Sequence, residues 1–318
     1  MASRIMSKII SAATLTYGER LNYLFQSVDR LLEQKFANIY IYCNGISLKN
    51  HQKIKGKYPS DNVVVLFSDV NLGSAGGYYE LLQYVIKNDN SDYLLLLDDD
   101  NRIPQNCFDK INKLEINDDE LFYFHRPDRM LPKIANDLKQ PEYVIGTHNS
   151  FLGRDLFSKL FKSTKSYAGD IIAAPYGGLL LNKHALNTGA LPKKELYLYA
   201  DDYEYTYRLV TEFGFKILFS ETILIEDLEK SFHLKKGNKF LTNRYSNANK
   251  NQLYYSVRNN TWLGLHRCES RLLYLLNLSF YSSLFILQFL LTFKFKKISI
   301  FISAIKDGFS FYFRDEKQ

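Results

Sequence analysis

The chain has 318 residues, enough for one large domain or two small ones around a buried core. Its 46% hydrophobic and 24% charged residues are ordinary for a folded protein. The net charge of +7 is uneven, because residues 230–318 carry 15 Lys and Arg against 4 Asp and Glu, whereas residues 1–229 carry 26 against 30. A mildly acidic body with a basic tail argues against nucleic-acid binding over the whole fold and favours a tail that faces an anionic surface.

The first hundred residues alternate strands with helices. Strands are predicted at 8–16, 38–45, 62–68 and 92–97, helices over 18–34 and 71–87, and a short polar segment at 47–61. This alternation predicts an α/β fold with a mainly parallel sheet and right-handed crossovers. Ligands bind at the carboxyl ends of the strands in such sheets, and polar residues gather there at 16–20, 44–45, 69–73 and 98–100.

The second half of the chain is less regular. Strands are predicted near 121–125, 142–147, 169–182, 215–219 and 222–225, with a helix over 199–214. From about residue 250 the chain is predicted to be helical, and no internal repeat or low-complexity linker separates the parts. We therefore divide the chain into an α/β domain, 1–250, with halves 1–100 and 101–250, and a C-terminal helical region, 251–318, which is a candidate for membrane association.

The most informative stretch is "DYLLLLDDDNRIP", in which four leucines of a buried strand run into three aspartates. Asp98 and Asp100 are one residue apart, so on an extended chain both carboxylates point the same way and can reach one site. Clustered carboxylates beside a nucleotide-sized crevice suggest a divalent cation that bridges a diphosphate. A solvated turn or a helix cap is the alternative for such a run in isolation.

Several other nucleotide or phosphate enzymes fit the sequence poorly. The residue two positions after Asp100 is Arg102, where a haloacid dehalogenase phosphatase has Thr or Val. A GxxxxGK[ST] phosphate loop is absent, and "NLGSAGG" lacks the GxG of a dinucleotide fingerprint. Sugar-nucleotide pyrophosphorylases have a glycine-rich loop after the first strand, where this chain has "TYGER".

Three further groups are candidates for chemistry. "YADDYEYTYRL" places acidic residues near a helix N-terminus, where they either pair with the helix dipole or supply a general base. His233 follows the last predicted strand and is the most suggestive of the six histidines. Arg258 in "YYSVRNNTWL" is a candidate diphosphate clamp, with helix packing as the alternative.

Taken in order, "TLTYGERL", "YCNG", "NLGSAGGYYELL", "LLLLDDDNRIP", "YGGLLLNKHAL", "YLYADDYEYTYRL" and "YYSVRNNTWL" resemble the family 2 glycosyltransferases of the GT-A fold. The resemblance spans roughly residues 8–265. It implies that 1–250 is a GT-A catalytic domain, with 1–100 as its nucleotide-binding half and 101–250 as its acceptor and catalytic half. It is strongest to the bacterial rhamnosyl- and galactofuranosyltransferases that build O-antigen, capsule and cell-wall polysaccharide. It implies an inverting hexosyltransferase that moves a sugar from a UDP- or dTDP-linked donor to a hydroxyl of a glycan or lipid-linked saccharide.

The resemblance also assigns roles to residues. It implies that Thr16, Arg20, Asn44 and Asn71 lie against the nucleotide, and that Asp98 and Asp100 hold Mn²⁺ or Mg²⁺ on the donor diphosphate. His233 would complete the metal site, and Asp202 would be the catalytic base. The chain departs from the family pattern in having Asp201 where Glu is usual, and "CNG" where an acid commonly ends the second strand. A metal-dependent nucleotidyltransferase and a non-catalytic, membrane-docked scaffold are the alternative functions.

The last expectation concerns location. Residues 272–293 carry no charge and would form a helix of roughly 33 Å, long enough to span a membrane, but five polar residues interrupt them. With "KFKK" and further aromatics following, we expect shallow insertion into the cytoplasmic face of a membrane. A packed helical hairpin or a homo-oligomer interface is the alternative. The polar N-terminus and the three widely spaced cysteines predict a protein that stays in the cytoplasm.

Overall fold

The computed structural model describes residues 7–127, 147–162, 165, 167–229 and 245–317. Its central sheet has seven strands in the order β3-β2-β1-β4-β7-β6-β8 among these residues. The strands are β1 (Ile10–Thr16), β2 (Ile39–Asn44), β3 (Val63–Ser68), β4 (Tyr93–Asp98), β6 (Glu120–His125), β7 (Leu179–Asn182) and β8 (Lys216–Leu224). A second, two-stranded sheet pairs β5 (Asn101–Arg102) with β9 (Glu226–Asp227).

The first four strands pair in parallel, as the alternation of strands and helices predicted. β7 runs antiparallel to both β4 and β6, while β6 and β8 are parallel. The carboxyl ends of β6 and β8 therefore lie at the same edge of the sheet as those of β1 to β4. This edge collects the polar residues that follow each strand.

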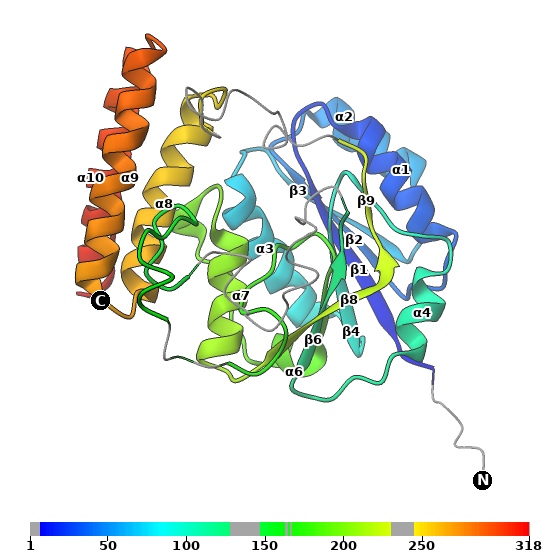
Figure 1. The fold of residues 1–318 in the computed structure, drawn as a ribbon. Helices are drawn as coiled ribbons and strands as arrows, with labels where there is room; N and C mark the ends of the chain where they lie inside the picture. Colours follow the sequence, from blue (N-terminus) through cyan, green and yellow to red (C-terminus); the bar gives the residue numbers. More distant parts are fainter. Residues whose placement is uncertain (1–6, 128–146, 163–164, 166, 230–244, 318) are drawn as a thin grey trace.

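Helices cover both faces of the sheet (Figure 1). One apolar core lies under α1 (Leu21–Leu32), α2 (Leu48–Lys57) and α4 (Cys107–Lys113). The other lies under α3 (Gly73–Asn88), α6 (Lys183–Asn187) and α7 (Asp201–Thr211). β1 and β2 are buried along their whole length, because both of their faces meet a helical layer.

Three helices form the C-terminal region: α8 (Lys250–Arg267), α9 (Arg271–Leu291) and α10 (Phe295–Asp315). They stand together beside α7 and the beginning of α3 (Figure 1). Their shared apolar core includes Trp262, Phe285 and Phe301, and it also takes in Ala75 of α3 and Ala200, the residue before α7. The helical region thus packs against the elements that carry the second acidic cluster.

Some predicted elements differ from the structure. The polar segment 47–61 contains helix α2, which Ser47 begins by accepting a hydrogen bond from the Asn50 backbone at 3.2 Å. The predicted strands 215–219 and 222–225 are one strand, β8, and only the last four residues of 169–182 form one, β7. The predicted strand 142–147 lies almost entirely outside the described residues. The division at residue 250 stays a prediction.

Candidate active site

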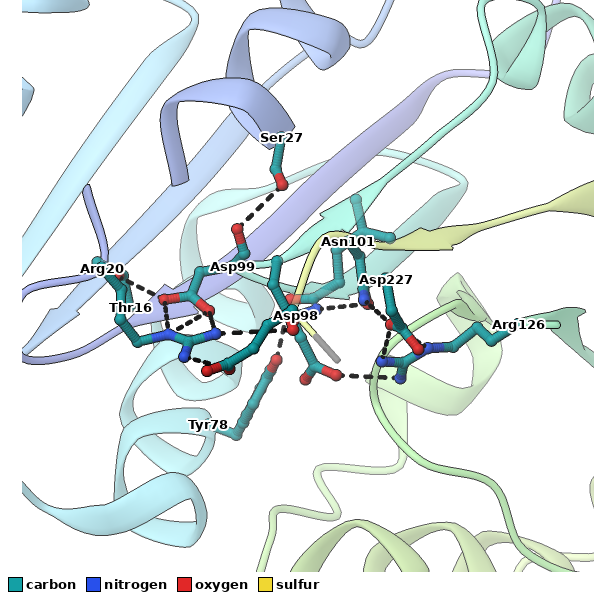
Figure 2. A network of polar contacts seen from close by, with 12 residues as sticks. Thr16, Arg20, Ser27, Tyr78, Asp98, Asp99, Asn101, Arg126 and Asp227 are labelled. Atoms are coloured by element: carbon teal, nitrogen blue, oxygen red, sulfur yellow. Dashed lines mark hydrogen bonds and ion pairs between the residues drawn. The ribbon is translucent and has the colours of Figure 1, made fainter. Parts of the chain in front are cut away.

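The three consecutive aspartates stand where β4 ends. The strand finishes at Asp98, and residues 99 and 100 form a turn before β5 begins. Asp98 and Asp100 were predicted to point the same way because the chain would be extended there. That reason is wrong, because residues 99 and 100 form a turn. The turn sends Asp98 toward Arg126, whereas Asp99 and Asp100 both lie near Arg20, at 2.9 and 3.6 Å from its Nη2. Figure 2 shows Asp98 and Asp99 with these arginines at the end of the strand.

Of the three aspartates, Asp99 has a structural role. Its carboxylate accepts a hydrogen bond from the Thr16 hydroxyl at 2.8 Å and from Nε of Arg20 at 2.9 and 3.0 Å. Its own carbonyl accepts from Ser27 on α1 at 2.9 Å (Figure 2). Arg20 also pairs with Glu229 at 2.5 Å. Thr16 and Arg20, which were predicted to lie against the nucleotide, are thus committed to holding Asp99, and their contact with a nucleotide stays a prediction.

Asp98 faces a different arginine. Nη1 of Arg126 lies 3.0 Å from Oδ2 of Asp98, and the same guanidinium hydrogen-bonds to Asp227 at 3.0 Å through Nε and more closely through Nη2. Asn101 joins the group by donating to Asp227 at 2.8 Å and accepting from the Asp98 backbone at 2.9 Å. Arg126 and Asp227 are almost fully buried, whereas the Asp98 side chain is 38% exposed. Asp98 is therefore the carboxylate through which this network reaches solvent.

The backbone at Gly177 packs directly on this network. A Cβ at Gly177 would lie 2.1 Å from Arg126 Nη1 and 2.6 Å from Asp98 Oδ2. Gly177 also accepts a hydrogen bond from Arg126 at 3.2 Å through its carbonyl. Any larger residue would push the arginine and the aspartate apart, so the ion pair requires glycine here.

The donor chemistry of the site fits a divalent cation. Burial and the neighbouring carboxylates of Asp98 and Asp99 together raise the pKa of Asp100 to about 7. Carboxylates that repel one another are stabilised as anions by a hard cation, and oxygen is the ligand that Mn²⁺ and Mg²⁺ accept. Asp98 and Asp100 would hold the ion. The third predicted ligand, His233, lies outside the described residues, and within the described part no three His, Cys, Asp or Glu residues are grouped to bind a metal.

The second acidic cluster begins helix α7. Asp201 is buried, and Ser74 on α3 donates a hydrogen bond to it at 2.9 Å. Asp202 is only partly buried and accepts from the backbone N–H of Tyr203 at 2.8 Å. Burial and the negative charges of Asp201 and Asp98 together raise the pKa of Asp202 well above its ordinary value. Ser74 lies one turn before Tyr78 on α3, and Tyr78 donates to the Leu97 carbonyl beside Asp98, so both acidic clusters lie against the same helix.

Tyr78 of α3 lies between the clusters. Its hydroxyl donates to the Leu97 carbonyl at 3.0 Å, one residue before Asp98 (Figure 2). Its ring stacks on Tyr176 with centroids 3.9 Å apart. Burial and the charges of Asp98, Asp99 and Asp201 raise the pKa of Tyr78. Tyr78 therefore fixes α3 to the end of β4, beside Asp98.

Asn44 and Asn71 shape the turn into helix α3. The Asn44 side chain is buried, donates to the Gly73 carbonyl at 2.9 Å and the Asn71 side chain at 3.3 Å, and accepts from the Leu72 backbone at 2.8 Å. A carboxylate at this position would face the Gly73 carbonyl and the Asn71 oxygen without a proton to donate. This is a physical reason for "CNG" in place of an acid. Asn71 is exposed beside Asn44, so its contact with a nucleotide stays a prediction.

Arg258 has other partners than a diphosphate. Its guanidinium donates to the carbonyls of Glu195 at 2.8 Å and Leu196 at 2.9 Å, and to the Asn259 side chain at 2.8 Å. These contacts tie helix α8 to the segment just before Asp201. No contact joins Arg258 to Asp98 or Asp100 among the described residues, and the clamp role stays a prediction.

Arg126 and Asp227 are the site residues that the sequence reasoning missed. Arg126 comes directly after β6, and Asp227 comes three residues after β8. The rule that polar residues at the carboxyl ends of strands form the site would have found both. It was applied only to the first four strands, because the direction of the later strands could not be derived from the sequence.

Comparison with known proteins gives a fold. No family model matches the chain, and no curated protein matches its sequence. Among solved structures, the mannosyltransferase PcManGT from Pyrobaculum calidifontis, in complex with GDP-Man and Mn²⁺, has a TM-score of 0.53 at 9% identity, covering 94% of this chain and 74% of that one. TarS of S. aureus in complex with UDP has a TM-score of 0.48 at 12% identity, covering 83% and 67%.

The fold assignment rests on the mannosyltransferase, since the likeness to TarS is weaker. Both chains share the mainly parallel sheet between helical layers, as the resemblance of the sequence implied. At this identity the likeness concerns the arrangement of the backbone alone. The chain therefore has the α/β architecture of the GT-A fold.

Proposed function

We propose that the protein is a metal-dependent, inverting glycosyltransferase that uses a nucleotide-sugar donor. The observation that carries the proposal is that one helix, α3, contacts both acidic clusters: Ser74 donates to Asp201, next to Asp202, and Tyr78 donates to the Leu97 carbonyl, next to Asp98. It brings a candidate metal-binding carboxylate and a candidate base to one site on a GT-A fold. The neighbours whose structures contain GDP-Man with Mn²⁺, or UDP, support a nucleotide-sugar as the substrate class.

The chemistry divides between the two clusters. Asp98, Asp100 and His233 would hold Mn²⁺ or Mg²⁺, which when bound neutralises negative charge on a departing nucleoside diphosphate. Asp202 would take the proton of the acceptor hydroxyl as that oxygen attacks the anomeric carbon. A carboxylate with a raised pKa is a stronger base, and the environment of Asp202 raises its pKa. A single displacement from the opposite face inverts the anomeric configuration.

We further propose that the donor is UDP- or dTDP-linked galactofuranose, rhamnose or a related hexose, and the acceptor a glycan or lipid-linked saccharide. A screen of UDP-, dTDP- and GDP-sugars with Mn²⁺ tests both the glycosyltransferase activity and the identity of the donor. Release of a nucleoside diphosphate supports glycosyl transfer, and NMR of the product gives the anomeric configuration. Release of pyrophosphate would instead indicate a nucleotidyltransferase, and no turnover of any donor would favour a binding scaffold.

We also propose that helix α9 docks the protein on the cytoplasmic face of a membrane. Asn277, Ser282 and Gln288, three of the polar residues that interrupt this segment, are buried. Asn277 donates to the Asn149 carbonyl at 2.9 Å and to Asp155 at 2.8 Å. The opposite face is exposed and mainly apolar, with Ser279 and Ser283 as its polar residues and with Leu272, Leu275, Leu276, Phe280, Leu287, Leu290 and Leu291. The helix is the one membrane-span candidate among the described residues, by length and composition alone.

The turn between α9 and α10 extends this apolar face. Phe293 is 80% exposed and Phe295 is 58% exposed, and Lys296 beside them is exposed too. Lys294 and Lys297 instead donate to backbone carbonyls of residues 245–248, so only part of "KFKK" faces solvent. Aromatic side chains next to a cation suit the headgroup region of an anionic membrane. The polar residues Asn277, Ser282 and Gln288 lie on the buried face of α9, and its exposed face is mainly apolar. This difference between the two faces supports shallow docking rather than a span.

Vesicle flotation with and without phosphatidylglycerol tests the docking. Leu276→Glu with Leu287→Glu should abolish flotation, because both changes put charge on the exposed face without touching the buried one. Gln52→Glu, at an exposed position of α2, controls for added charge away from α9. If the wild type stays with the soluble fraction and the double variant dissociates a dimer in light scattering, α9 is an oligomer interface instead.

A further inference from the structure

The segment just before the second acidic cluster has an unusual backbone. Tyr197, Tyr199 and Ala200 have φ values of 63°, 67° and 62°, in the left-handed region that residues with a Cβ rarely adopt. Ala200 is the N-cap of α7, so Asp201 and Asp202 follow the strained turn directly. Such strain persists only when surrounding contacts hold it.

One buried side chain makes most of those contacts. Asn259 of α8 is fully buried, and its amide nitrogen lies 2.8 Å from each of the carbonyl oxygens of Leu196, Leu198 and Tyr199. The amide oxygen of Asn259 accepts from Nε of Arg258 at 2.8 Å, which fixes which end of the amide faces the turn. A neighbouring helix thus gathers three carbonyls that the left-handed residues direct toward it.

The turn is also held by the start of helix α3. The backbone N–H of Ala75 on α3 donates to the Tyr197 carbonyl at 3.2 Å. A Cβ on Gly73 would lie 1.9 Å from that same carbonyl oxygen, so α3 and the turn are in direct contact. The turn therefore joins the start of α3, helix α8 and the start of α7 in one rigid unit.

We infer that Asn259 is a positioning residue for Asp202, acting through the turn at 197–200. The inference rests on the proposed function, in which Asp202 is the base. Only an amide both donates to the turn carbonyls and accepts from Arg258; a carboxylate of the same shape cannot donate. Without the donor, the carbonyls lose their partner, the turn relaxes toward commoner φ values, and the first turn of α7 shifts Asp202 relative to Asp98. Small displacements of a catalytic group are costly in rate.

The test uses Asn259→Asp, with Asn260→Ala as the matched control. Asn260 is the next residue of α8, and its side chain bonds only to the Ser256 carbonyl of its own helix at 2.8 Å among the contacts described. Asn259→Asp should lower kcat by about 10²-fold while the KM for the donor stays within about twofold. Combined with Asp202→Asn it should cause no further loss, because both changes disable the same base. Asn260→Ala should match the wild type.

An additive loss in the double variant, or a loss confined to the donor KM, would overturn the inference. If Asn259→Asp does not fold, Arg258→Lys is the second variant. It removes the Nε donor that orients the Asn259 amide and leaves Asn259 itself in place. Hydrogen exchange of the amides of residues 197–202 provides a readout independent of activity. Exchange there should quicken in Asn259→Asp and not in Asn260→Ala, even if no sugar donor is turned over and the proposed function fails. If hydrogen exchange at these amides is unchanged in Asn259→Asp, Asn259 does not hold the turn at 197–200 and the inference is refuted.

Discussion

Arg126 Nη1 lies 3.0 Å from Asp98 Oδ2, although the two residues come from different strands of the sheet. The guanidinium also pairs with the buried Asp227, so one cation serves two carboxylates. The aspartate cluster, which has no cation preceding it in the local sequence, is thus partly neutralised in the folded chain. This relationship leads to the first prediction.

Arg126→Met should destabilise the protein by about 3–5 kcal/mol, because it leaves Asp227 buried without its ion pair. Arg102→Met is the control. Arg102 pairs with Glu226 on the same small sheet at 2.5 Å, but both side chains are substantially exposed, so its loss should cost less than about 1 kcal/mol. Urea unfolding measures both. Adding Asp227→Asn to Arg126→Met should recover part of the stability, and equal losses for the two single variants would contradict this account.

Asp100→Ala should abolish sugar transfer and metal-dependent donor binding while the fold stays intact. Its carboxyl is held near two others that raise its pKa, so its removal relieves repulsion. Asp99→Ala should instead reduce stability by about 1–3 kcal/mol, since the Thr16 and Arg20 side chains lose their acceptor. Calorimetry with a donor, with and without Mn²⁺, and thermal unfolding separate the two outcomes. Donor binding by the wild type that needs no metal would count decisively against the assignment of Asp100.

Asp202→Asn should reduce turnover by about 10²–10⁴-fold and leave donor affinity unchanged, because a base acts in the transition state rather than in donor binding. The amide oxygen can still accept the Tyr203 N–H bond that the carboxylate now accepts, so the helix start is preserved. Steady-state kinetics together with donor titration check this. A parallel loss of donor affinity would place Asp202 on the metal or the nucleotide.

Asp201 should make stability depend on pH. Burial raises its pKa to about 7 in the folded protein from an ordinary 3.8, so between these values the folded state binds more protons than the unfolded state. The stability that protonated Asp201 contributes to the folded state is therefore lost as pH rises through about 7. Asp201→Asn keeps an acceptor for Ser74 and should raise Tm by about 2–4 °C at pH 8, with no gain at pH 4. Asp61→Asn at an exposed turn controls for charge. A gain in Tm that is the same at both pH values would rule out titration of Asp201 as the cause.

The sequence by itself determined the local features of this protein. Periodicity located β1 to β4 and the helices α1 and α3, because the spacing of apolar residues reflects which face of each element is buried. It also placed Asp98 at a strand end and Asp202 in the first turn of a helix. In a parallel sheet these facts alone predict that ligands meet the carboxyl ends of the strands.

Only the tertiary structure decided which side chains meet. β7 reverses direction between β4 and β6, and that reversal brings Arg126 and Asp227 to Asp98. Residue spacing cannot encode such pairing, because strand order and direction depend on contacts between segments far apart in the chain. The same holds for Asn259, which is 57 positions from Asp202 in the sequence yet bonds to the turn before it. It holds as well for α9, because the sequence does not show that Asn277, Ser282 and Gln288 lie on its buried face, where Asn277 bonds to Asn149 and Asp155.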